Sequence, residues 1–114
     1  MTVAIVAGAH GQTASPATAQ TTQTTVVAEA DAFVDAGRPN RNFGYATRLH
    51  VAASTERRSY LRFDVPAVDG TIRRAVLRVR VDAGSSLGFD VRGVGSTTWS
   101  EGGVTYRTAP AMAT

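Results

Sequence analysis

The residues best suited to bind a ligand lie close together between positions 38 and 50. They are three arginines, two asparagines, a tyrosine and a histidine, namely Arg38, Asn40, Arg41, Asn42, Tyr45, Arg48 and His50. Guanidinium groups donate paired hydrogen bonds to carboxylates, and amide side chains exchange hydrogen bonds with hydroxyls. A tyrosine ring adds a flat face for stacking. The segment therefore fits a hydroxyl-rich ligand that carries carboxylates. The alternative is a simple turn, with Phe43 buried and the arginines solvated.

Tyr60 and Arg62 are two further candidate ligand residues. They lie in the segment 57–65, where apolar Leu61 and Phe63 alternate with polar side chains. A period of two predicts a half-buried strand, because successive side chains of a strand point to opposite faces. We therefore expect Leu61 and Phe63 to face a core, and Tyr60 and Arg62 to face outward.

A catalytic site is not expected. The chain has no cysteine and two histidines, and His10 lies in a polar N-terminal segment, so a catalytic triad would have to form around His50. A lyase site built from His50, Tyr60 and Arg62 is the main catalytic alternative. The same side chains are also typical of polar pairing across neighbouring strands on a solvated face. We predict that the chain is not an enzyme.

Nucleic acid and cofactors are not expected as partners. The net charge is +3 and all twelve basic residues are arginine. Acids alternate with the arginines, as in Arg62 and Asp64, so the pattern predicts mixed-sign ladders, whereas phosphate contacts favour a clustered basic patch. A structural calcium ion is left open, because Glu29, Asp31 and Asp35 could supply carboxylate oxygens, although their spacing matches no calcium-loop motif.

Short strands must position these residues. Six segments alternate or are rich in strand-forming residues and are separated by turn signals, namely 26–34, 47–52, 57–65, 73–82, 89–94 and 104–107. The pattern predicts one all-β domain, an antiparallel β-sandwich, over residues 26–114. Trp99 could be a sugar platform, but the core is its expected place. Such sandwiches usually have about seven or eight strands, so we expect the domain to be incomplete at its C-terminus.

Residues 1–25 are expected to be a disordered leader or linker. They are mostly Ala, Thr, Gln, Gly and Ser, and such a composition buries too little apolar surface to offset the entropy of ordering. The sequence Ala17-Thr18-Ala19 is similar to a cleavage site, so the segment could be the remnant of a signal peptide followed by a spacer. No stretch is long enough to span a membrane.

Several phrases in a fixed order resemble a known family. They are Ala30-Asp31-Ala32-Phe33-Val34, Pro39-Asn40-Arg41-Asn42-Phe43-Gly44, Arg58-Ser59-Tyr60-Leu61-Arg62-Phe63-Asp64, Ala75-Val76-Leu77-Arg78-Val79, Trp99-Ser100-Glu101, Val104-Thr105-Tyr106 and Ala109-Pro110. Together, over about Val27 to Ala111, they resemble the DNRLRE domain, the disaggregatase-related group treated as carbohydrate-binding module family ninety-six.

The resemblance implies a jelly-roll β-sandwich appended to secreted bacterial or archaeal proteins, often beside a polysaccharide lyase or hydrolase. It implies binding of acidic polysaccharide such as alginate through basic residues, with Arg38, Arg41, Tyr45 and Arg48 as candidate ligands. Tyr60 and Arg62 belong to the family's strand signature. The literal string Asp-Asn-Arg-Leu-Arg-Glu and lysine are absent here, and family domains continue beyond the Ala-Pro phrase.

These observations predict a non-catalytic carbohydrate-binding module of an exported, extracellular protein, tethered to a catalytic domain in a longer parent. Its expected ligand is an acidic polysaccharide held on an arginine-rich face. Two alternatives remain open. The first is a structural or adhesive spacer module of a cell-surface protein without a ligand of its own, and the second is a fragment of a lyase.

Overall fold

The computed structural model describes residues 2–8, 11–12, 23–84 and 88–113 of the chain. Over these residues the chain forms strands and turns without a helix, so none of them belongs to a helix that could cross a bilayer. The predicted all-β class is confirmed. The strands are β1 (Thr2–Gly8), β2 (Gly11–Gln12), β3 (Ala30–Asp35), β4 (Ala52–Ala53), β5 (Glu56–Asp64), β6 (Val68–Asp69) and β7 (Asp90–Gly93).

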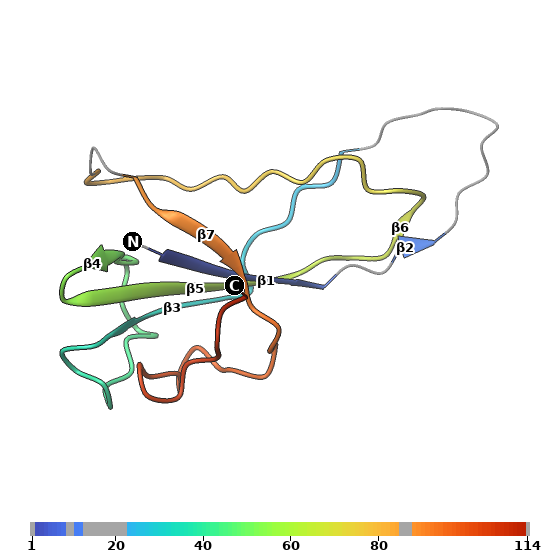
Figure 1. Ribbon diagram of the computed structural model, residues 1–114. Helices are drawn as coiled ribbons and strands as arrows, with labels where there is room; N and C mark the ends of the chain where they lie inside the picture. The colour runs from blue at the N-terminus through green and yellow to red at the C-terminus, as the bar shows by residue number, and fades with distance from the viewer. Residues whose placement is uncertain (1, 9–10, 13–22, 85–87, 114) are drawn as a thin grey trace.

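The main sheet is organised around β5. Its strands follow the order β3, β5, β1, β7, and β4 also pairs with β5 (Figure 1). Strands β3 and β5 are antiparallel, with the small side chain of Ala32 directly opposite Tyr60. Strand β1 runs parallel to both of its neighbours, β5 and β7. Strands β2 and β6 form a separate two-residue pair. The antiparallel pairing of β3 with β5 is in keeping with the predicted sandwich class.

The N-terminal segment differs from the expectation of a disordered leader. Residues Thr2–Gly8 form β1, and Gly11–Gln12 form β2; the other residues up to position 22 lie outside the described part. The average composition of residues 1–25 hides the short β-branched run Val3 to Val6, which favours extended backbone. That run pairs with β5 on one side and with β7 on the other. The signal-remnant interpretation stays a prediction.

The side chains of β5 do not face the way that the alternation predicted. Tyr60 is fully buried, at 0% exposure, so the prediction that it faces outward is wrong. It belongs to the core cluster, which consists of Ala30, Ala32, Val34, Tyr60, Val94, Trp99 and Val104. Tyrosine can be buried when its polar tip finds a partner, and the Tyr60 hydroxyl donates to the carbonyl oxygen of Pro110 at 3.2 Å. Leu61, on the opposite face, is buried as well.

The other predicted strands have mixed outcomes. The segments 26–34, 57–65 and 89–94 are confirmed in β3, β5 and β7, with shifted bounds. The segment 47–52 contributes only the start of β4, and 104–107 forms no strand, since a turn begins at Tyr106. The prediction of a strand at 73–82 is wrong, because this segment has no strand pairing in the described structure and most of its side chains are exposed. Alternation provides a suitable face, but a strand also needs a neighbour with free backbone groups.

Two long loops cover the pair formed by β3 and β5. The loop 36–51 packs Phe43 and His50 against Phe33 of β3. The loop 94–112 supplies Trp99 and Val104 to the core on the Tyr60 face. The two loops meet beside β3 (Figure 1), where Asn42 contacts the second loop. The predicted position of Trp99 in the core is confirmed, since it is 7% exposed.

Candidate functional site

The loop that carries most of the candidate ligand residues begins at a turn held by Asp35. The Asp35 carboxylate accepts a hydrogen bond from the Gly37 backbone N–H at 2.8 Å, and its carbonyl oxygen accepts one from the Arg38 N–H at 3.0 Å. Arg57 of β5 forms an ion pair with the other Asp35 oxygen at 3.2 Å. An aspartate at the start of a turn is favoured because its side chain can bond the backbone two residues on. The turn presents Arg38 and Asn40 to solvent.

Asn42 anchors the loop and is not free for a ligand. Its Nδ2 donates to the carbonyl oxygens of Glu101 and Val104, both at 2.8 Å, and its Oδ1 accepts from the Gly44 N–H at 3.0 Å. A Cβ atom at Gly44 would overlap the Glu101 carbonyl oxygen, so the two loops touch through their backbones there. These contacts use the donors of the Asn42 amide, and we therefore exclude this residue from the candidate site.

Phe43 packs the loop against strand β3. Its ring stacks on Phe33 with a centroid separation of 4.4 Å and an interplanar angle of 20°. The Arg41 guanidinium lies over the Phe43 ring, 5.2 Å from its centroid. Arg41 also donates from Nη2 to the Tyr45 hydroxyl at 2.8 Å, and Tyr45 is 69% exposed. A buried aromatic pair thus holds an exposed arginine and an exposed phenol next to each other.

Tyr45, Arg48 and His50 share a surface depression, which we name the Tyr45 depression. It has a volume of about 400 Å³, and its lining residues are Phe33, Tyr45, Ala46, Thr47, Arg48 and His50. The His50 ring packs edge to face against Phe33, with a separation of 4.7 Å between the ring centroids. The His50 carbonyl oxygen accepts a 2.7 Å hydrogen bond from the Ser59 hydroxyl of β5. The sheet therefore fixes the backbone behind the depression.

The charges at this site are accessible. Arg48 lies 3.5 Å from Asp82 as an ion pair, but its side chain is 72% exposed, and exposed pairs contribute about 0–1 kcal/mol. Arg38 and Arg41 take part in none of the ion pairs formed within the described residues. By contrast, Arg57, Arg58 and Arg62 of β5 each pair with an acid. On the loop, an incoming carboxylate would therefore meet two arginines without an acidic partner among the described residues, Arg38 and Arg41, and one exposed ion pair at Arg48. The three arginines of β5 are already paired with acids.

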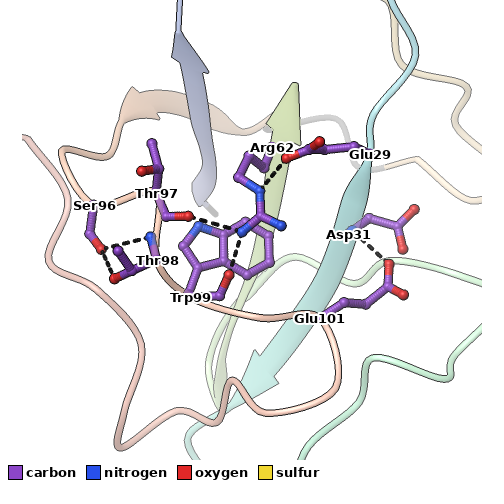
Figure 2. A network of polar contacts seen from close by, with 8 residues as sticks. All are labelled: Glu29, Asp31, Arg62, Ser96, Thr97, Thr98, Trp99 and Glu101. Atoms are coloured by element: carbon purple, nitrogen blue, oxygen red, sulfur yellow. Dashed lines mark hydrogen bonds and ion pairs between the residues drawn. The ribbon is translucent and has the colours of Figure 1, made fainter. Parts of the chain in front are cut away.

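Tyr60 and Arg62 have structural roles away from the Tyr45 depression. Arg62 donates from Nε to Glu29 at 2.6 Å and from Nη1 to the carbonyl oxygens of Thr97 and Trp99, with its guanidinium 5.0 Å from the Trp99 ring centroid (Figure 2). Burial raises the pKa of the Tyr60 phenol, so it stays protonated and donates to Pro110. Neither side chain presents a ligand-binding group at the loop surface.

Three residues of the depression were not foreseen from the sequence. Phe33, Ala46 and Thr47 line it beside the predicted residues. Phe33 belongs to a predicted strand, and no pattern in the sequence says which loop will cover its face. Arg38 and Asn40, which were predicted, lie in the adjoining turn and do not line the depression.

Two of the three carboxylates considered for calcium have separate partners. Glu29 bonds Arg62, and Asp35 bonds Gly37 and Arg57. Asp31 lies beside Glu101, whose Oε1 accepts from the Asp31 backbone N–H at 2.9 Å. Burial, and then the Glu101 carboxylate, raise the pKa of Asp31. Among the described residues no group of three or more His, Cys, Asp or Glu side chains is arranged to hold a metal ion.

Comparison with known proteins gives one match. The family model of carbohydrate-binding module family 96 matches residues 22–114, a range that includes both covering loops and strands β3 and β5. No curated protein and no solved structure matches the chain.

Proposed function

The chain belongs to carbohydrate-binding module family 96, and from this premise we propose that it binds an acidic polysaccharide at the Tyr45 depression and the adjoining arginines. The membership confirms the resemblance inferred from the motifs. Modules of carbohydrate-binding families are typically non-catalytic, which supports a binding role without chemistry. The proposal concerns where the sugar lies and which groups hold it.

The observation that carries this proposal is the joint position of Arg41, Tyr45, Arg48 and His50. Arg41 is bonded to Tyr45, and the other three line one depression. A sugar ring can stack on an exposed aromatic face while its carboxylate accepts hydrogen bonds from a guanidinium fork. The hydroxyls of such a ring can bond the His50 ring nitrogens and the Thr47 hydroxyl.

The arginines of the loop can bind a sugar carboxylate without losing strong contacts within the protein. Because the pair between Arg48 and Asp82 is exposed, a uronate carboxylate can replace Asp82 at little cost. Arg41 keeps donor groups besides the Nη2–H that bonds Tyr45. Arg38 and Asn40, in the preceding turn, extend the same loop and are proposed to contact neighbouring sugar units of a chain. Tyr60, Arg62 and Asn42 are not part of this proposal, because their polar groups already have protein partners.

The family also supports the wider setting of the module. We propose a jelly-roll β-sandwich that acts in an exported protein and directs an attached catalytic domain to polysaccharide. Calcium at Glu29, Asp31 and Asp35 has less support, since Glu29 and Asp35 each pair with a different arginine.

Affinity electrophoresis tests the proposal. The protein is run in gels that contain alginate, a neutral glucan or no polymer. Retardation by alginate alone is the expected result. Retardation by both polymers would keep carbohydrate binding and reject the preference for acidic sugars. Migration unchanged by either polymer would reject the proposal and favour the spacer module.

A further inference from the structure

A second and larger hollow lies at the C-terminal end of β5, which we name the Trp99 cleft. It has a volume of about 630 Å³ and is lined by Glu29, Arg62, Phe63, Asp64 and the loop residues 97–100. It shares no lining residue with the Tyr45 depression. Figure 2 shows Glu29, Arg62 and the loop residues Thr97 to Trp99 gathered around this region.

The walls of the Trp99 cleft are preorganised. Arg62 is fixed by Glu29 on one side and by the carbonyl oxygens of Thr97 and Trp99 on the other. The hydroxyls of Ser96 and Thr98 lie 3.0 Å apart, which holds the turn that leads into the loop. A site whose groups are already held in place loses less entropy when a ligand binds.

The charge of this cleft is opposite to that of the Tyr45 depression. Glu29 and Asp64 contribute two negative charges, and Arg62 contributes one positive charge that Glu29 already neutralises in part. Asp64 is exposed and forms no ion pair with any described residue. The remaining charge is negative, so the cleft repels carboxylates and attracts cations.

The polar groups of the cleft are suited to hydroxyls. Thr97, Thr98 and Ser100, which carry hydroxyl groups, are among the lining residues, and the carboxylates of Glu29 and Asp64 are hydrogen-bond acceptors. Trp99 also lines the cleft, is 7% exposed, and its indole N–H has no hydrogen-bond partner within the described structure. Buried polar groups are normally paired, so this N–H is a buried donor beside the cleft that lacks an acceptor.

From these features we propose that the Trp99 cleft is a separate binding site for an amino sugar with a free, protonated amine. Asp64 receives the ammonium group, and the hydroxyls of loop 97–100 bond the sugar hydroxyls. The acidic polysaccharide then binds at the basic Tyr45 depression, and the cationic amino sugar binds at the acidic Trp99 cleft.

Trp99 makes this site directly observable, because it is the only tryptophan of the chain. Its indole N–H gives a single resonance in a nitrogen–proton correlation spectrum. The protein is titrated with glucosamine oligomers at a pH where their amines are protonated, with the N-acetylated oligomers, and with oligouronates. The free-amine oligomers are expected to shift the Trp99 indole resonance in a saturable way, and the acetylated oligomers to bind about threefold to tenfold more weakly.

Two variants sharpen the result. Asp64→Asn is expected to weaken the free-amine oligomers about threefold to tenfold and to leave the acetylated oligomers unchanged. Asp90→Asn removes an exposed acid from β7 and serves as the matched control, with no expected effect. A Trp99 resonance that fails to move, or equal affinity for free and acetylated oligomers, would overturn the inference. Alginate binding at the Tyr45 depression would be unaffected by either outcome.

Discussion

The side-chain amide of Asn42 donates a 2.8 Å hydrogen bond to the backbone carbonyl oxygen of Glu101, 59 positions further along the chain. A second bond from the same nitrogen reaches Val104. The loop that carries Tyr45 and Arg48 is thus tied to the loop that closes the core around Tyr60. The position of the proposed sugar site depends on this junction as well as on the sheet.

Asn42→Ala is expected to lower the free energy of unfolding by about 1–3 kcal/mol, because two carbonyl oxygens lose their donor. Chemical denaturation followed by circular dichroism measures the loss. Asn40→Ala, in the exposed part of the same loop, is the matched control and should change stability by less than about 0.5 kcal/mol. Equal effects of the two substitutions would contradict the anchoring role of Asn42.

Gly44→Ala is expected to be strongly destabilising, by more than about 2 kcal/mol, because the new Cβ would overlap the backbone carbonyl oxygen of Glu101. Neither partner is a flexible side-chain end, so one of the loops must shift. Gly102→Ala is the control, since a Cβ at that position meets no atom within 4 Å. Thermal unfolding compares the two. A stable Gly44→Ala protein would show that the two backbones do not approach this closely.

Tyr60→Phe separates a structural role from a ligand role. Loss of the hydroxyl leaves the Pro110 carbonyl oxygen without its donor and should cost about 0.5–1.5 kcal/mol of stability. The ring stays in the core against Trp99, at a centroid distance of 5.9 Å. Affinity for polysaccharide is expected to be unchanged. A variant with normal stability and lost affinity would restore Tyr60 to the binding site.

Asp31→Asn tests the pair of carboxylates at the edge of β3. Burial and Glu101 raise the pKa of Asp31 in the folded protein above its ordinary value of 3.8. Because the folded protein binds this proton more tightly than the unfolded chain does, protonation of Asp31 stabilises the fold below its ordinary pKa. This contribution is lost as the pH rises through the folded-state pKa. At neutral pH the variant should therefore be more stable than the natural chain, and the difference should narrow in acid. Unfolding curves over a range of pH measure it, and a variant that is less stable at neutral pH contradicts the prediction.

The sequence predicted the all-β class, strands β3, β5 and β7, and the loop that carries the candidate ligands. It did not predict that Tyr60 is buried. The alternation of polar and apolar residues in β5 suggests one solvated face, whereas both faces of the strand are covered. The alternation with Leu61 and Phe63 predicts that Tyr60 faces outward, yet its hydroxyl bonds the carbonyl oxygen of Pro110, 50 positions away, inside the fold. A hydrogen-bond partner so distant in the chain cannot be recognised from the residues next to Tyr60 in the sequence.

The same limit applies to the site. The cluster from Arg38 to His50 is visible in the sequence. The sequence does not show which of its side chains are already hydrogen-bonded within the protein and which are available to a ligand. Asn42 and Asn40 look alike in the sequence, and only contact with the loop 99–104 distinguishes them. Strand 73–82 was predicted from alternation alone, and its failure to pair shows that a suitable face does not supply a neighbouring strand.

The most direct test of the proposed site is the affinity of three variants for an alginate oligosaccharide, measured by isothermal titration calorimetry. Arg41→Ala and Arg48→Ala each remove a guanidinium from the site, while Arg92→Ala removes an exposed one from β7. The account predicts that each of the first two weakens binding about fivefold or more, because a charge-assisted hydrogen bond is lost, and that Arg92→Ala does not. Folded Arg41→Ala and Arg48→Ala proteins that bind alginate as tightly as the natural chain would contradict it.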